Sequence, residues 1–130
     1  MTELMQNEIE RTLEQYGQAL STGDLVDIAD GWTVPALVLD TTGAIAVAQR
    51  SEVEAFFGRA VEWYRSRGLA STRPDDVRVE SLGGGLAAVD VRWRAYDAAG
   101  QEQSSERSYY ILHRGDDGRW RIRVALTRTE

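Results

Sequence analysis

The sequence predicts a single domain of the α+β class. In its first half apolar residues recur at three to four residue steps, which is typical of amphipathic helices, whereas its second half alternates apolar and polar residues as strands do. Helices that come first and strands that come last indicate helices packed on one face of a curved antiparallel sheet. With 130 residues, 42% of them hydrophobic, the chain can bury one core, so we expect one domain over residues 1–130.

The first helix is expected between Leu4 and Leu20. Its apolar positions form one stripe, which consists of Met5, Ile9, Leu13, Tyr16 and Leu20. Gly23 suits the left-handed position that follows many helices, and Asp24 suits the N-cap of a short second helix. This second helix should end by Gly31.

A hairpin and a third helix are expected next. Two β-rich runs flank the segment DTTG (residues 40–43), which predicts the hairpin, and Pro35 should lie on a sheet edge. The segment SEVE (residues 51–54) has the pattern of a capping box and predicts the start of a helix that ends at Gly68. The apolar stripe of this helix comprises Val53, Phe56, Phe57, Ala60 and Tyr64.

Four strands are expected after the third helix, because the hydrophobic period changes to two. Glycine-rich turns separate them, and they cover residues 76–82, 86–96, 103–114 and 119–128. The face toward the helices should carry Val89, Val91, Trp93, Trp120, Ile122, Val124 and Leu126. The other face should carry Arg92, Arg94, Arg121 and Arg123 with Asp90 and Glu106. These charges either form cross-strand pairs or bind an anionic ligand or subunit.

Composition excludes several classes of function. The net charge of −6 argues against binding to nucleic acid or to an anionic membrane surface. The absence of cysteine excludes disulfides and thiolate chemistry, and the single histidine, His113, excludes a metal site built on several histidines. We therefore expect no metal and no cofactor. No apolar run suits a signal peptide or a membrane span, so a cytoplasmic soluble protein is expected.

The segment YGQALSTGDLVDI, which begins at Tyr16, resembles the Tyr-x-x-Ala-Leu-x-x-Gly-Asp-Leu-x-x-Ile segment of ketosteroid isomerases. The order of three helices, an early hairpin and a long meander is similar to that of the NTF2-like, or cystatin-like, cone of SnoaL-like and ketosteroid-isomerase-like proteins. The resemblance implies this fold along nearly the whole chain. The same fold hosts isomerases, dehydratases, cyclases, hydrolases and binding modules, so activity has to be argued from the site.

The resemblance also implies candidate catalytic residues. In ketosteroid isomerases a tyrosine of the first helix donates to an oxyanion, and an aspartate after the following strand moves a proton; these roles fall on Tyr16 and Asp40. The family's third group, a protonated acid that shares the oxyanion, should fall within ERSYYILH (residues 106–113), which offers Tyr109, Tyr110 and Glu106; Tyr110 is the candidate. The residues alone leave two alternatives open, because Asp40 before Thr-Thr-Gly also suits a hairpin turn and Tyr16 also suits a buried core position.

A ligand cavity inside the cone is a further expectation. The candidates to line it are Trp32, Phe56, Phe57, Trp63 and Trp93, with Trp120, although ordinary core packing is the more common role of such residues. The sequence thus favours a protein that binds a small apolar or carbonyl compound and forms a homodimer through the open face of the sheet. The alternatives are an isomerase or cyclase that depends on aspartate and tyrosine, and a non-catalytic dimeric association module; whether the protein is an enzyme stays open.

Overall fold

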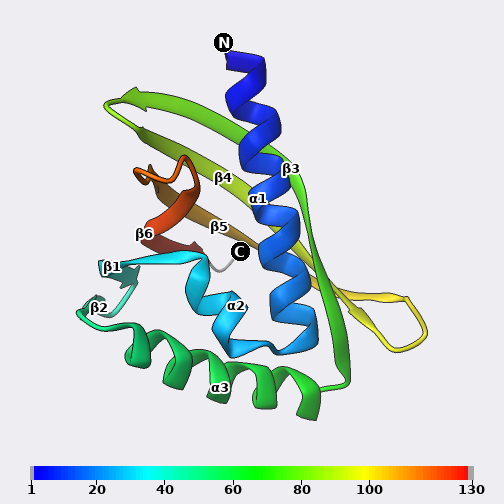
Figure 1. Ribbon diagram of the computed structural model, residues 1–130. Helices are drawn as coiled ribbons and strands as arrows, with labels where there is room; N and C mark the ends of the chain where they lie inside the picture. The colour runs from blue at the N-terminus through cyan, green and yellow to red at the C-terminus, as the bar shows by residue number, and fades with distance from the viewer. Residues whose placement is uncertain (1, 129–130) are drawn as a thin grey trace.

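The computed structural model describes residues 2–128 as three helices and one six-stranded sheet (Figure 1). In chain order the elements are α1 (Thr2–Thr22), α2 (Leu25–Asp30), β1 (Trp32–Asp40), β2 (Gly43–Val47), α3 (Arg50–Ser66), β3 (Leu69–Gly83), β4 (Leu86–Asp97), β5 (Glu102–Arg114) and β6 (Trp120–Arg128). The α+β class and the order of elements are confirmed. Figure 1 shows α1 lying across one face of the curved sheet, with α3 along one end of it. None of the helices within residues 2–128 has the length and apolar character needed to cross a membrane.

The sheet has the strand order β2-β1-β6-β5-β4-β3. All neighbouring strands are antiparallel except β1 and β6, which are parallel. Strand β1 is therefore an interior strand, and the expectation that Pro35 lies on an edge is wrong. Pro35 is tolerated because the pairing of β1 with β6 shifts register between Trp32 and Leu37, where no ladder hydrogen bond needs its missing N–H.

The junction between the first two helices follows local sequence signals. Gly23 has a φ of 74°, the left-handed conformation that glycine adopts without strain, and it ends α1. The carboxylate of Asp24 accepts a hydrogen bond of 3.2 Å from the backbone N–H of Asp27, so Asp24 is the N-cap of α2 as expected.

The capping box expected at residues 51–54 is wrong, because α3 begins at Arg50. The carboxylate of Glu52 accepts the backbone N–H of Gln49 at 3.0 Å and so closes the first turn of the helix. Glu54 instead pairs with Arg50 at 3.3 Å, one turn apart. The capping box therefore runs from Gln49 to Glu52, two residues before the expected one.

Strand β3 begins at Leu69, seven residues before the expected start at residue 76. Its first part pairs with β4 although it contains Pro74, which is tolerated because β3 is an edge strand. The pairing shifts between Asp75 and Arg78, where Asp76 has a φ of 48°. This bulge interrupts the alternation of inward and outward side chains, so the sequence pattern did not predict the first part of the strand.

The two faces of the sheet match the expectation in β4 but not throughout β6. Val89, Val91 and Trp93 of β4 are buried against the helices. In β6 the pairing with β5 contains a bulge, because Leu112 pairs with Ile122 whereas Ile111 pairs with Val124. The bulge reverses the alternation, so Ala125 is buried, whereas Val124 and Leu126 share the outer face with their β5 partners. The expected inward positions of Val124 and Leu126 are therefore wrong.

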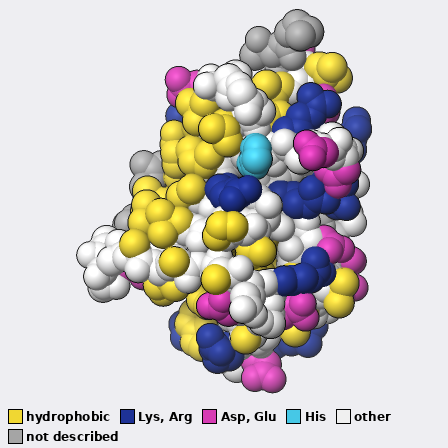
Figure 2. Space-filling view, turned by 60° about the vertical axis from the view of Figure 1, so that its left-hand side comes forward, with side chains coloured by type: hydrophobic (Ala, Val, Ile, Leu, Met, Phe, Trp, Pro, Cys, Tyr) yellow, Lys and Arg dark blue, Asp and Glu magenta, His cyan; other side chains and the backbone are white. Residues whose placement is uncertain are grey.

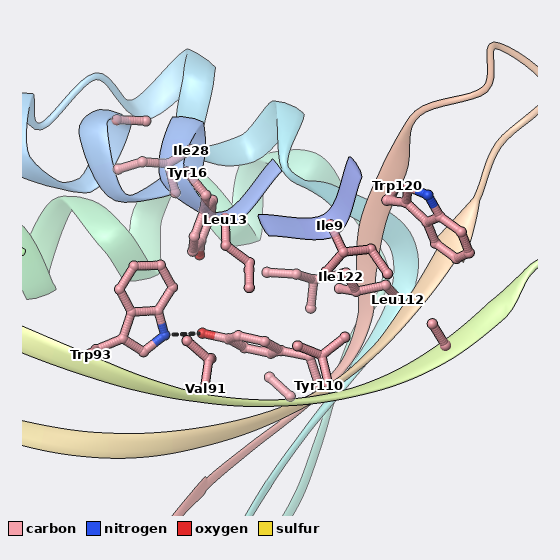
Figure 3. Close-up of a cluster of buried hydrophobic side chains, with 14 residues drawn as sticks. Ile9, Leu13, Tyr16, Ile28, Val91, Trp93, Tyr110, Leu112, Trp120 and Ile122 are labelled. Atoms are coloured by element: carbon pink, nitrogen blue, oxygen red, sulfur yellow. Dashed lines mark hydrogen bonds between the residues drawn. The ribbon is translucent and has the colours of Figure 1, made fainter. Parts of the chain in front are cut away.

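The core lies between α1, α2 and the inner face of the sheet (Figure 3). Its largest fully buried side chains are Ile9, Leu13, Ile28, Leu112, Val89 and Val91. Glycine makes room for two aromatic rings at its edge. A Cβ added at Gly31 would lie 2.7 Å from the Tyr16 ring, and one added at Gly17 would lie 3.1 Å from the Trp93 ring.

Replacement of Gly31 by alanine tests this close packing. We expect Gly31→Ala to lower the free energy of unfolding by about 1–3 kcal/mol, because the methyl group overlaps the buried Tyr16 ring and overpacks the core. Equilibrium unfolding in urea measures the change.

Gly58→Ala is the matched control, since a Cβ at Gly58 lies 3.6 Å from Leu25, an ordinary contact, and alanine favours helix by up to about 1 kcal/mol. Gly58→Ala should leave stability unchanged or raise it. Equal stability of the Gly31→Ala variant and the wild type would show that the Tyr16 ring is not held as described.

Candidate functional site

Tyr16 lies on the inner side of α1 and accepts a hydrogen bond from a tryptophan. The indole Nε1 of Trp32, the first residue of β1, donates to the Tyr16 hydroxyl at 2.9 Å. Burial raises the pKa of Tyr16 well above its ordinary value, and the nearby Tyr110 acts in the same direction. The phenol is therefore protonated at neutral pH. Its oxygen is an acceptor in this bond, so its own proton remains available for another acceptor.

Tyr110 repeats the arrangement on the sheet. The indole Nε1 of Trp93 on β4 donates to the hydroxyl of Tyr110 on β5 at 2.9 Å, and both side chains are buried (Figure 3). Burial raises the pKa of Tyr110 to about 12, against the opposing effect of its hydrogen bonds with Ser108 and Trp93. Two protonated phenols, each accepting from an indole, thus lie within electrostatic reach of each other.

Ring contacts, together with the hydrogen bond between Trp93 and Tyr110, join five residues into one aromatic cluster, defined here as Tyr16, Trp32, Phe57, Trp93 and Tyr110. The Tyr16 ring centroid lies 6.1 Å from that of Trp93 and 6.4 Å from that of Phe57, and the Phe57 centroid lies 6.0 Å from that of Trp32. Such tilted and edge-on contacts are favourable for aromatic pairs. The cluster brings together five of the expected site residues, from α1, β1, α3, β4 and β5.

Phe56 and Trp63 lie outside this aromatic cluster. Their side chains are 53% and 54% exposed on α3, and the Arg67 guanidinium lies 4.8 Å from the Trp63 ring. Adjacent helix residues point about 100° apart, so Phe57 packs on Tyr16 whereas Phe56 reaches only the edge of Phe57. Neither exposed ring is placed to line a cavity inside the cone.

Asp40 lies in the hairpin turn, which is the alternative position that the sequence left open. Its Oδ1 accepts from the N–H and hydroxyl of Thr42 at 2.7 and 2.6 Å and from the N–H of Gly43 at 3.0 Å. These bonds lower the pKa of the exposed Asp40 carboxyl. At about 3.3 Å per residue, the length of β1 separates it from Trp32 by on the order of 25 Å. The structure does not bring Asp40 to Tyr16.

Glu106 is a carboxylate that the sequence placed on the wrong face. It pairs with Trp93 across β4 and β5 and shares the inner face with Tyr110. Its Oε1 accepts from the Tyr64 hydroxyl of α3 at 3.3 Å. Burial, followed by the charge of Glu106, raises the pKa of Tyr64 to about 12. Glu106 and Tyr110 are four residues apart on β5, so their side chains point to the same face of the strand. This spacing is the sequence signal that could have placed Glu106 inside the cone.

A groove of about 550 Å³ lies between α1, α2 and the turn before β6. Its floor consists of five buried residues, Leu13, Tyr16, Leu112, Trp120 and Ile122. Its walls consist of Glu8, Arg11, Thr12, Gln15, Gln18, Ala19, Thr22, Asp27, Asp30, Gly31, Gly118 and Arg119. Tyr16 therefore belongs both to this groove and to the aromatic cluster. A cavity of this size, apolar at its base with polar groups around it, suits a small molecule.

Trp120 in the floor of the groove has an unsatisfied donor. The residue is 5% exposed, and its Nε1 has no hydrogen-bond acceptor among the described residues. A buried donor without a partner costs about 1–3 kcal/mol, so an acceptor supplied from the groove would be stabilising. Figure 3 shows Trp120 at the rim of the buried cluster. The sequence predicted that Trp120 faces the helices and could line a cavity, but no local pattern reports a missing acceptor.

Comparison with known proteins identifies the family of the chain. Residues 7–130 match the family model described as NTF2-like protein (DUF6841). The chain belongs to this NTF2-like family. The expected NTF2-like, cystatin-like fold is thereby confirmed. No curated protein matches the chain.

Solved structures share the fold at low sequence identity. A protein of unknown function from Mycobacterium tuberculosis is 18% identical with a TM-score of 0.76, over 99% of this NTF2-like chain and 73% of its own. A candidate scytalone dehydratase from Novosphingobium aromaticivorans is 14% identical with a TM-score of 0.74, over 100% and 89%. A candidate ketosteroid isomerase from Shewanella frigidimarina is 17% identical with a TM-score of 0.67, over 91% and 92%. At such identities the likeness shows the fold alone.

Removal of the Tyr110 hydroxyl tests the indole–phenol pair on the sheet. We expect Tyr110→Phe to lower the free energy of unfolding by about 1–3 kcal/mol, because the buried Trp93 Nε1 loses its acceptor. Tyr109→Phe is the matched control, since Tyr109 precedes Tyr110 on β5 and points to the outer face. Urea unfolding at pH 7 checks both variants, and equal effects of the two would contradict the pairing.

The stability of the same variants should also differ in its dependence on pH. The unfolded chain releases a phenolic proton near pH 10, whereas folded Tyr110 holds its proton to about 12. The free energy of unfolding of the wild type therefore falls as pH rises from about 10 to about 12, and Tyr110→Phe reduces this fall.

Proposed function

We propose that this NTF2-like protein binds a small, largely apolar carbonyl compound in the groove. The observation that carries the proposal is the position of Tyr16, whose ring forms part of the groove floor and whose hydroxyl oxygen accepts from Trp32. That bond leaves the phenolic proton without a use, and the proposal requires a carbonyl oxygen of the ligand to reach the buried hydroxyl from the groove. Leu13, Leu112 and Ile122 offer the apolar surface that would cover its body.

Tyr110 supports this donor from the sheet side. Its charge state acts on the pKa of Tyr16, so the two hydroxyls are close enough to interact, and Tyr110 is held by Trp93 as Tyr16 is held by Trp32. Donors fixed in place before the ligand arrives need little reorganisation on binding. The paired phenols favour an oxygen acceptor over a purely apolar ligand.

Isomerase or cyclase activity is the second candidate function. The candidate ketosteroid isomerase and scytalone dehydratase among the structural neighbours make it relevant. Enolisation needs a base near the carbonyl compound, and Asp40 lies at the hairpin turn. Glu106 is the carboxylate on the inner face, and its charge raises the pKa of Tyr110, so it is the residue we assign as base if the protein is an enzyme.

Binding of the neutral ketone 2-acetylnaphthalene tests the first proposal. Its binding is followed by quenching of tryptophan fluorescence, and we expect Tyr16→Phe to weaken it about tenfold. The loss of one hydrogen bond of about 1.4 kcal/mol corresponds to this factor. A circular dichroism melt establishes that Tyr16→Phe is folded at the assay temperature.

Tyr109→Phe is the control for this experiment, because Tyr109 lies on the outer face of the sheet. It should bind the ketone as the wild type does. Unchanged affinity of Tyr16→Phe, or no binding by the wild type, would contradict a carbonyl site at Tyr16.

We also propose that the protein forms a homodimer through the outer face of the sheet. An outer apolar patch runs across three adjacent strands, with Leu37 beside Val124 and Ile111, and Leu39 beside Leu126 and Tyr109. Figure 2 shows hydrophobic side chains gathered beside the histidine side chain on this side of the molecule. Monomeric proteins rarely expose contiguous apolar patches of this kind, which favours self-association. If side chains of the protein fill the cone and no ligand binds, the protein is a non-catalytic association module, and dimerisation is its function.

A charge placed in the outer apolar patch tests the homodimer. We expect Ile111→Arg to shift the wild-type dimer to monomer in sedimentation velocity, since two copies of the new charge would be buried at the interface. Leu82→Arg is the matched control, because Leu82 is exposed at the far end of edge strand β3 and lies outside the patch. A monomeric wild type, or a dimer that both variants leave intact, would contradict the proposal.

A further inference from the structure

Two arginines of the groove form no ion pair and donate no side-chain hydrogen bond among the described residues, although the charge of Arg119 helps to lower the pKa of the nearby Asp117. Most arginines are engaged: Arg50, Arg78, Arg94, Arg107 and Arg121 form ion pairs, Arg65, Arg114 and Arg123 donate hydrogen bonds, and Arg67 and Arg73 lie over aromatic rings. Among the arginines from residue 11 to residue 123, the others are Arg11, Arg59, Arg92 and Arg119. Arg11 and Arg119 both line the groove.

The two guanidinium groups belong to opposite walls. Arg11 lies on α1, and Arg119 lies in the turn that leads into β6. Trp120 follows Arg119 and contributes the buried Nε1 that has no acceptor among the described residues. Three side chains whose N–H groups donate no hydrogen bond among residues 2–128 therefore line the groove. A guanidinium presents several N–H groups in a planar fork, and a carboxylate accepts up to about four hydrogen bonds, so the two are complementary.

The acidic side chains of the groove do not neutralise the two arginines. Asp27 and Asp30 belong to α2 and its end, beyond the C-terminus of α1, and Asp30 pairs with Arg50 at 2.8 Å. Glu8 lies one helical turn before Arg11, where an ion pair is geometrically accessible, yet it makes no ion pair. Asp27 and Asp30 thus lie at one end of the groove, whereas Arg11 and Arg119 lie toward the turn before β6, with Glu8 beside Arg11 and Asp117 paired with Arg121 at 2.6 Å.

We propose that the ligand of the groove is a carbonyl compound that also carries a carboxylate, and that Arg11 and Arg119 bind this carboxylate. The proposal rests on the carbonyl site proposed at Tyr16. Residues 11 and 16 are separated by about 7.5 Å along the helix axis and by about 140° around it, so the exposed Arg11 side chain has to bend over the groove toward the ligand. A rigid aromatic ligand with an acetyl group at one end and a carboxylate at the other spans this distance. Leu13, between the two positions, contacts its apolar body.

Three naphthalene probes separate the two groups of the ligand. The probe 6-acetyl-2-naphthoate carries both groups, 2-acetylnaphthalene carries only the ketone, and 2-naphthoate carries only the carboxylate. Titration of the full chain, followed by tryptophan fluorescence, gives each dissociation constant. We expect 6-acetyl-2-naphthoate to bind at least tenfold more tightly than 2-acetylnaphthalene, and its affinity to fall as salt rises because exposed charges are screened.

Variants of the groove identify the groups responsible. Arg11→Gln with Arg119→Gln should weaken 6-acetyl-2-naphthoate at least tenfold and leave 2-acetylnaphthalene unchanged. Arg59→Gln is the matched control, since Arg59 is an exposed arginine of α3 without a partner and lies outside the groove. Glu8→Gln should tighten binding of 6-acetyl-2-naphthoate about twofold or more, because it removes the negative charge nearest to Arg11. These residues are at the surface, so all four substitutions should leave the fold intact.

The outcomes distinguish this proposal from the one on which it rests. Ketone binding that depends on Tyr16, with no preference for the carboxylate and no effect of the arginine variants, overturns the carboxylate site and leaves the carbonyl site standing. Carboxylate binding that depends on the arginines but not on Tyr16 overturns the carbonyl site and supports the arginine pair. Absence of binding by all three probes overturns both.

Discussion

The packing around Tyr16 is the constraint on which the rest of the site depends. Its ring fills the space left by the missing side chain of Gly31, contacts Phe57 and Trp93, and receives the indole N–H of Trp32. One residue thus joins α1, the start of β1, α3 and the sheet. Close packing transmits any displacement of this ring to all four elements, so the position of the phenol and the closure of the cone are a single property.

Electrostatics explains why so charged a chain still contains a distinct site. On the outer face Arg107 pairs with Asp76 and Asp90, and Arg94 pairs with Asp75 and Glu102, so these cations are neutralised by cross-strand neighbours. This is the ladder of charge pairs that was one alternative for the arginine-rich face. Few arginines lack such neighbours among the described residues. The presence of two of them in the groove says more about a possible ligand than the net charge does.

Local signals predicted much of the fold, and long-range contacts determined what the sequence missed. Gly23 and Asp24 act within one helix junction, so they could be read directly. The bulge in β6 could not, since Val124, Ala125 and Leu126 are all apolar and either register buries a hydrophobic side chain. The site shows the same division. Tyr16 was predicted from a motif, whereas the Trp120 N–H, which has no acceptor among the described residues, and the inner position of Glu106 depend on strands that are far apart in the sequence.

The bulge in β6 also separates two surfaces in a way that matters for divergence within the fold. Upstream of it Ile122 contributes to the groove, and downstream of it Val124 and Leu126 belong to the outer apolar patch. Deletion of one residue there would turn the downstream segment over and leave the upstream segment in place. A relative that lost this single residue would keep the groove side of the strand while its outer surface presented different side chains. Substitutions on the two surfaces can therefore accumulate independently on one strand.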